Sequence, residues 1–220
     1  MSVETTNTQA TQVLSDRINR LAESATIAMA KKARELEAQG HSVIKLNFGE
    51  PDFQTPDYIK AAAKQAIDDG FTFYTPVSGY PELRKAIADK LKRDNQLPWE
   101  AENIVVSTGA KQSLANALMC LLNPGDEVIV FAPYWVTYSE IIKVAEGQAV
   151  IVGGSLENNF KVTPEQLEAA ITPKTKAILY SSPSNPTGSV YTKDELRGLA
   201  DVLARHEDVF VIADEIYEYV

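Results

Sequence analysis

The sequence has very little of what stabilises secreted or metal-binding proteins. Its 220 residues include one cysteine and two histidines, so it has no disulfide framework and a poor set of metal ligands. We expect Cys120, in the apolar stretch "LANALMCLL", to be a core residue. Lys and Arg number 21 against 30 Asp and Glu, a net charge of −9. This balance argues against nucleic acid and anionic membranes as partners.

Long apolar runs are also lacking. No run approaches the roughly 20 residues that span a bilayer. The start, "MSVETTNTQATQV", has neither the basic nor the apolar region of a secretory signal peptide. We therefore expect a cytoplasmic protein without a membrane anchor. With 45% hydrophobic residues, the chain can still bury a sizeable core.

The amino-terminal part indicates a polar arm followed by helices. Residues 1–14 are polar and rich in Thr, which predicts a mobile arm. Helices are predicted where apolar residues recur at helical spacing and where Pro or Gly marks an end. These predicted helices cover residues 26–39, 56–70 and 81–95.

From Asn103 onward, short β-branched runs alternate with helical segments. This alternation predicts an α/β fold with a mostly parallel sheet and helices on both faces. Two of the helix starts carry a capping box, at Thr163 and at Thr192. The predicted strands cover residues 104–108, 127–131, 148–152, 176–181 and 209–214.

Chemistry in such sheets gathers at the carboxyl ends of the strands. After the first predicted strand, Gly109, Ala110 and Lys111 open a helix whose free backbone N–H groups attract a phosphate, although Gly109 also suits an ordinary turn. After the second, Trp135 either packs at the rim or stacks on a planar ligand.

The last two predicted strands end in polar residues. Asn185 lies between two prolines, where it either forms a turn or presents its amide from a stiff loop. Asp214 ends a buried strand, so its carboxylate needs a partner, for which a cation is expected. No Lys or Arg is close to it in sequence, which leaves a ligand as a candidate.

The run "VFVIADE" also resembles the segment that holds Mg²⁺ in nucleotide hydrolases. Such proteins need a phosphate loop that contains Gly-Lys. The sequence has no Gly-Lys dipeptide, which argues against an ATPase.

Taken together, the strand ends describe a pocket for a flat, phosphorylated ring that can be protonated. Pyridoxal 5′-phosphate has these properties. The sequence also resembles the fold-type I, class I aminotransferases, in the branch of bacterial aspartate aminotransferases. The resemblance covers nearly the whole chain, through "NFGEPDFQTP", "FTFYTPVSGYPELRKAI", "STGAKQSL", "NPGDEVIVFAPYWVTY", "SSPSNPTGSVYTKDEL" and "ADEIYEYV".

The resemblance implies roles for individual residues in binding this cofactor. Trp135 matches the residue stacked on the pyridine ring, and Asp214 matches the partner of the ring nitrogen. Asn185 and Tyr217 match the residues that hydrogen-bond the phenolic oxygen. The residues matching the phosphate side are Gly109, Ala110, Lys111 and Tyr74, the last reaching the cofactor of a neighbouring subunit, which implies a homodimer.

The implied reaction moves an amino group between an amino acid and a 2-oxo acid. Asp214 and Tyr217 are the catalytic candidates. The Asp214 carboxylate beside the ring keeps the ring protonated, and Tyr217 bonds the phenolic oxygen. Gly49, Lys111, Trp135 and Asn185 are expected to meet the substrate. Lys111 suits a second carboxylate, which favours acidic substrates such as aspartate.

The sequence departs from the family in one respect. The lysine that holds the cofactor, known as the Schiff-base lysine, lies beyond the segment matching "ADEIYEYV", as does the arginine for the α-carboxylate. We expect the 220-residue chain to be inactive by itself. The alternative is a catalytically inactive binding or interaction fragment of the same fold.

The resemblance also implies a division of the chain. Residues 1–48 are expected to form an arm and a helix of the small domain, and residues 49–220 part of the cofactor-binding large domain. The strand at 104–108 is not expected to pair with the other four, because two later strands lie between. The exposed edges that result predict poor solubility.

Overall fold

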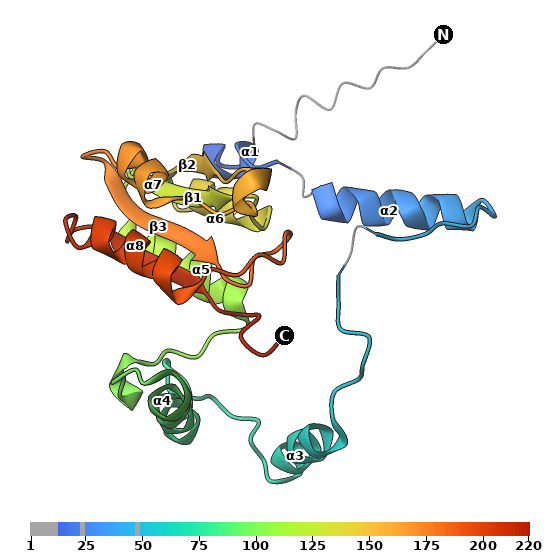
Figure 1. The fold of residues 1–220 in the computed structure, drawn as a ribbon. Coiled ribbons are helices and arrows are strands. Elements are labelled where there is room, and N and C mark those ends of the chain that lie inside the picture. The colour runs from blue at the N-terminus through green and yellow to red at the C-terminus, as the bar shows by residue number, and fades with distance from the viewer. Residues whose placement is uncertain (1–12, 23–24, 47–48) are drawn as a thin grey trace. The chain divides into compact units, whose positions relative to one another are not determined.

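The computed structural model describes residues 13–22, 25–46 and 49–220 of the chain (Figure 1). Most of the predicted amino-terminal arm, residues 1–12, lies outside this described part. The chain divides into two units. The sheet unit consists of Met1–Ala25 and Ala110–Val220, and the helical unit consists of Thr26–Gly109.

The sheet unit is built on four parallel strands. The strands are β1 (Glu127–Ala132), β2 (Gln148–Gly153), β3 (Thr175–Ser181) and β4 (Phe210–Asp214). Their order is β2-β1-β3-β4, and all three pairings are parallel. Four of the predicted strands are therefore confirmed within one residue. The prediction that the last of them is a buried strand is wrong, because only Asp214 among the five residues of β4 is buried.

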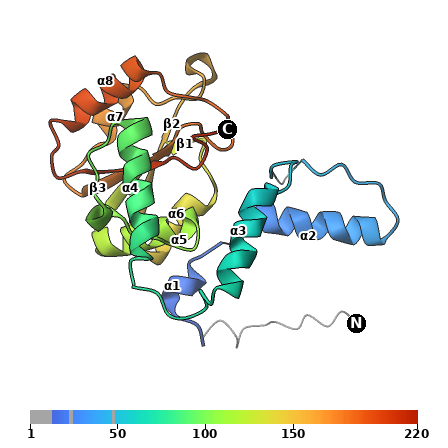
Figure 2. The same cartoon turned by 90° about the horizontal axis from the view of Figure 1, so that it is seen from below.

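Helices cover both faces of this sheet (Figures 1 and 2). Val128 and Val130 of β1 pack on one face against α5 and α6, and Ile129 and Phe131 pack on the other against α7 and α8. This split follows from the pleat, because successive side chains of a strand point to opposite faces. The helices are α5 (Ala110–Leu121), α6 (Thr137–Val144), α7 (Pro164–Ala170) and α8 (Lys193–Leu203).

Both predicted capping boxes are present at the starts of α7 and α8. The Thr192 hydroxyl accepts a hydrogen bond from the Glu195 N–H, and the Glu195 carboxylate accepts one from the Thr192 N–H at 2.7 Å. Thr163 and Gln166 form the same reciprocal pair. These local bonds satisfy N–H groups that a helix start leaves without partners.

A short helix, α1 (Asp16–Asn19), belongs to the same unit. It lies against α6 and its following turn, where Arg17 and Arg20 both pair with Glu146. The short 3₁₀ helix η2 (Leu156–Asn158) follows β2. None of the helices in the described ranges is long and apolar enough to cross a membrane.

The helical unit contains three longer helices and one 3₁₀ turn. They are α2 (Ala25–Ala38, its first residue in the sheet unit), α3 (Asp57–Asp68), α4 (Pro81–Asn95) and η1 (Ala101–Asn103). The helix predictions are thus confirmed, with Gly40 and Gly70 at positive φ just past two ends. The Arg84 guanidinium joins α4 to the η1 region by donating to the carbonyls of Ala101 and Ile104.

The prediction of a strand at 104–108 is wrong. Ile104 is extended, but residues 104–107 have no regular secondary structure. A strand needs a neighbouring strand, and here Val106 N–H instead donates to Ser78 O of a turn at 3.0 Å. Val106 also packs so closely on Gly79 that a Cβ there would lie 2.6 Å from its side chain. The four-stranded sheet does not include this segment, as the resemblance implied.

The placement of Cys120 in the core is also wrong, because its side chain is exposed. Helix α5 buries Leu114 and Leu118, which lie four residues apart on one side. Cys120 follows Leu118 by two residues, and this spacing places it on another side of the helix.

A tight turn after β2 provides a test of the packing. We predict that Gly154→Ala destabilises the protein, because its new methyl group would lie 2.2 Å from the backbone carbon of Phe160. Overpacking of this kind costs roughly 1–3 kcal/mol, measurable as the free energy of unfolding in urea. Gly153→Ala is the matched control, since nothing lies within 4 Å of its Cβ position. Equal stabilities would contradict the described contact.

Candidate active site

Asp214 is a buried carboxylate at the carboxyl end of β4. It pairs in register with Ser181 of β3 and is 9% exposed. Its Oδ2 atom accepts a hydrogen bond from the Tyr138 hydroxyl at 2.7 Å, and its Oδ1 atom accepts one from the Ile216 N–H at 3.3 Å. Both of these donors are neutral groups of the chain, and the supply of a cationic partner by a ligand stays a prediction.

Tyr138 is the functional candidate that sequence reasoning missed. It lies in the first turns of α6, three residues after Trp135, and it is 2% exposed. Burial, and next the Asp214 carboxylate, raise the pKa of its hydroxyl well above the usual value. The hydroxyl therefore stays protonated at physiological pH and donates to Asp214. The only sequence signal is its helical spacing from Trp135, because Asp214 is 76 residues away.

Trp135 contacts Tyr138 and Lys111. Its ring meets the Tyr138 ring edge-on, with centroids 5.7 Å apart and planes at 89°. The Lys111 ammonium, from the first turn of α5, lies 4.9 Å from the Trp135 ring centroid. Cation and ring are close enough to attract each other. The structure thus brings Lys111, Trp135 and Asp214 together through Tyr138.

Asn185 and Tyr217 form a second polar pair. The Asn185 side-chain amide donates to the Tyr217 hydroxyl at 3.2 Å, and both side chains are half-buried. Tyr217 follows Asp214 by three residues, so this pair and the buried carboxylate belong to the same end of the sheet.

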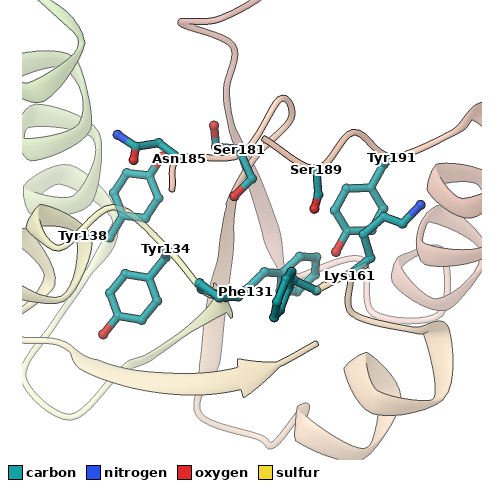
Figure 3. A pocket seen from close by; sticks show the side chains of 11 residues that line it. Phe131, Tyr134, Tyr138, Lys161, Ser181, Asn185, Ser189 and Tyr191 are labelled. Carbon is teal, nitrogen blue, oxygen red and sulfur yellow. The ribbon is translucent and has the colours of Figure 1, made fainter. Parts of the chain in front are cut away.

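A small cavity lies beside these residues (Figure 3). Tyr138 and Asn185 line one side of it, and Ser189, Tyr191 and Lys161 line the other. Its volume is about 10 Å³, which is room for roughly one water molecule. A ligand of cofactor size would therefore not fit inside this cavity.

The remaining candidates surround the start of α5 or lie in the helical unit. Gly109 has a φ of +83°, a conformation that L side chains rarely adopt, and Ala110 begins the helix. The expectation of a free N–H is wrong for Gly109, because this group donates to Ser107 O at 2.9 Å. Tyr74 is fully exposed. Gly49, Tyr74 and Gly109 belong to the helical unit, whose position relative to the sheet unit is not determined.

The described residues fit pyridoxal 5′-phosphate chemically. Asp214 offers a buried acceptor for a protonated ring nitrogen, and Tyr138 keeps that carboxylate in place. Asn185 and Tyr217 offer donors to an oxygen of the same ring. Trp135 supplies an aromatic face, whose edge-on contact with Tyr138 connects it to the same carboxylate.

The Tyr138–Asp214 hydrogen bond can be tested directly. We predict that Tyr138→Phe lowers the free energy of unfolding at pH 7 by roughly 1.5–3 kcal/mol, because a buried carboxylate loses its donor. Tyr134→Phe is the control, since Tyr134 stacks on Tyr138 without bonding Asp214. Urea titrations of the two variants measure the difference. A Tyr138→Phe variant as stable as its control would rule out a structural role for this bond.

Comparisons with known proteins match this chain along most of its length. The sequence model of the family "Aminotransferase class I and II" matches residues 41–220. The chain is 55% identical over 206 residues to an aspartate/prephenate aminotransferase of Cereibacter sphaeroides, covering 94% of this chain and 52% of that protein. It is 49% identical over 205 residues to an aspartate aminotransferase of Geobacillus stearothermophilus, with shares of 93% and 52%.

Solved structures agree. The aspartate aminotransferase of Rhizobium meliloti has a TM-score of 0.89 and 45% identity, over 91% of this chain and 50% of that one. The Thermus thermophilus aspartate aminotransferase with maleate has a TM-score of 0.88 and 46% identity, over 92% of this chain and 53% of that one. The chain spans about half the length of the curated relatives that it matches. On this evidence, the chain belongs to the class I and II aminotransferase family.

Proposed function

We propose that the protein is an aminotransferase that moves an amino group between an L-amino acid and a 2-oxo acid through pyridoxal phosphate. The observation that carries this proposal is the buried Asp214 carboxylate, held by Tyr138 at the end of the sheet beside Trp135. Class I aminotransferases of the aspartate aminotransferase type use this cofactor. The names of the relatives support the same reaction.

Asp214 and Tyr217 are the proposed catalytic residues. When bound, the cofactor supplies a protonated ring that takes up the electrons released at the substrate's Cα. Asp214 would hold the proton on the ring nitrogen, since an adjacent negative charge favours the charged form of the ring. Tyr138, which donates to Asp214 Oδ2, fixes the orientation of that carboxylate. Tyr217, together with Asn185, would donate to the phenolic oxygen.

The other proposed contacts bind the cofactor rather than hold its protons. Trp135 would stack on the ring, and the N–H groups of Gly109, Ala110 and Lys111 would meet the phosphate. A phosphate at such a helix start gains from unpaired N–H groups and from the helix dipole. The Gly109 N–H donates to Ser107 O at 2.9 Å in the structure, so it would have to exchange this bond for one to the phosphate.

An acidic substrate is proposed from the position of Lys111. Its exposed ammonium lies over Trp135, so it can pair with a second carboxylate on a substrate beside that ring. The relatives are named for aspartate or for aspartate and prephenate. Both compounds carry a second carboxylate. Gly49, Trp135 and Asn185 are the further residues proposed to meet the substrate.

A homodimer is the proposed assembly. Tyr74 is proposed to reach the phosphate of a second subunit's cofactor. Its full exposure leaves the side chain free to do so. The cytoplasmic location and the domain boundary between residues 48 and 49 remain predictions.

We predict that Asp214→Ala abolishes most of the turnover. The test uses the full-length protein, or a chimera in which this chain replaces the matching half of the 55% identical relative. Removing one partner of a buried charge pair costs roughly 3–5 kcal/mol, equivalent to more than 100-fold in rate. Asp208→Ala, an exposed carboxylate before β4, is the control. Near-normal transamination by the folded Asp214→Ala variant would refute the proposed function.

We predict that Lys111→Met changes substrate preference. The value of kcat/KM for aspartate should fall about 10-fold or more, because one charge-assisted hydrogen bond to the second carboxylate is lost. The value for alanine, which lacks that carboxylate, is the internal control. Cofactor affinity is measured separately by titration, because Lys111 also adjoins the proposed phosphate turn. An equal loss for both amino acids would contradict the substrate assignment.

A further inference from the structure

The loop that carries Asn185, residues 182–191, is closed by its own hydrogen bonds. The Ser184 N–H donates to Ser189 O at 2.9 Å, and the Gly188 N–H donates to Ser184 O at 2.7 Å. Ser184 directly precedes Asn185. The position of Asn185 is therefore coupled to that of Ser189 on the far side of the loop.

A second segment, residues 155–162, supports this loop; we call it the support turn. The Phe160 N–H donates to Ser155 O at 2.7 Å, and the Asn158 amide donates to Lys161 O at 2.9 Å. Val162, at its end, is 3% exposed and belongs to the core under α7 and α8. The core thus fixes the support turn.

Three hydrogen bonds connect the loop to the support turn. The Ser189 hydroxyl donates to Asn159 O at 2.6 Å, and the Val162 N–H donates to the Tyr191 hydroxyl at 2.7 Å. The Lys161 ammonium reaches Val190 O at 3.5 Å. Figure 3 shows Lys161, Ser189 and Tyr191 across the cavity from Asn185.

Burying the charged ammonium of Lys161 costs free energy. Lys161 is 9% exposed, and its ammonium pairs with Glu195 Oε1 at 2.5 Å. Buried charges need such a partner. The other Glu195 oxygen accepts from Thr192 N–H in the α8 capping box. Lys161 therefore meets both ends of the stretch from Val190 to Glu195, just behind the loop.

We propose that Lys161 and Ser189 are positioning residues that hold the Asn185 loop at the cofactor site. This inference rests on the proposed function in one respect, namely that the cofactor is the ligand of Asn185. The continuous path runs from Asn159 O to the Ser189 hydroxyl, from Ser189 O to the Ser184 N–H, and so to Asn185. Lys161 fixes the carboxyl-terminal side of the same loop.

The first measurement is amide hydrogen exchange of the full-length protein or the chimera, without cofactor. Lys161→Met and Ser189→Ala should speed exchange in residues 183–191 several-fold while leaving β1 and β3 unchanged. Glu195→Gln removes the ion pair but retains the capping box, because Gln also serves at that position. It should behave like Lys161→Met. Lys143→Met, which breaks a Lys–Glu pair on α6, is the matched control.

The outcomes decide the role of Lys161. Faster exchange confined to the start of α8 would mean that Lys161 only anchors that helix, and this would overturn the proposal. If Lys161→Met speeds hydrogen exchange throughout the protein, the variant has lost its fold, and the test then depends on Glu195→Gln and Ser189→Ala. Unchanged loop exchange in both of these would also overturn it.

The second measurement asks whether the loop acts through Asn185. In the full-length protein or the chimera, pyridoxal 5′-phosphate affinity should fall about tenfold in Asn185→Ala and about threefold in Lys161→Met and Ser189→Ala, effects of the size of one hydrogen bond or less. The pKa at which the bound cofactor's visible absorption changes should rise in all three, because a donor to the phenolic oxygen is lost or loosened. Lys161→Arg should restore both values.

The double variant Lys161→Met/Asn185→Ala completes the test. An effect no larger than that of Asn185→Ala alone supports action through Asn185. Additive losses would overturn it. Unchanged affinity and absorption in Asn185→Ala would refute the proposed role of Asn185 and the positioning role with it. Normal values in Lys161→Met beside altered values in Asn185→Ala would overturn the positioning role alone.

Discussion

The arrangement of the candidate site depends on the hydrogen bond between Tyr138 and Asp214. A buried carboxylate is costly unless donors satisfy it, and Asp214 is the buried residue at the end of an otherwise mostly exposed strand. The donor comes from α6, which follows β1, whereas Asp214 ends β4, and β3 lies between these two strands. The bond therefore connects α6, on one face of the sheet, to β4, two strands away from β1. It also sets Trp135, which precedes Tyr138 by one helical turn, beside the same strand ends.

The two faces of the sheet contribute differently to the site. The face covered by α5 and α6 supplies Lys111, Trp135 and Tyr138, whose mutual contacts place a cation, an aromatic ring and a hydroxyl next to Asp214. The face covered by α7 and α8 contains Tyr191, whose pKa burial raises to about 12 and which accepts a bond from the support turn. Asn185 is carried by the loop that is anchored on this second face, yet it bonds Tyr217 just beyond Asp214. The site is thus closed from both faces at the carboxyl ends of the strands.

How much of this could be predicted from the sequence depends on how local each cause is. Strands β1 to β4 and the boxes at Thr163 and Thr192 depend on residues within a few positions of each other, and all were predicted. The segment 104–108 has a strand-like composition, but a strand also needs a partner, which composition does not supply. The contact of Tyr138 with Asp214 spans 76 residues, so only the folded chain shows it.

Glu195 shows why a correct local prediction can still be incomplete. A capping box uses one carboxylate oxygen of its glutamate, and the pattern at Thr192 predicted that use. The second oxygen remains available, and it pairs with Lys161, 34 positions earlier in the sequence. Lys161, and next the bond from Thr192, lower the pKa of Glu195, so the charge needed for the pair is present at neutral pH. One residue therefore begins a helix and also neutralises a buried lysine behind the Asn185 loop, and a substitution there acts on both the helix start and the site.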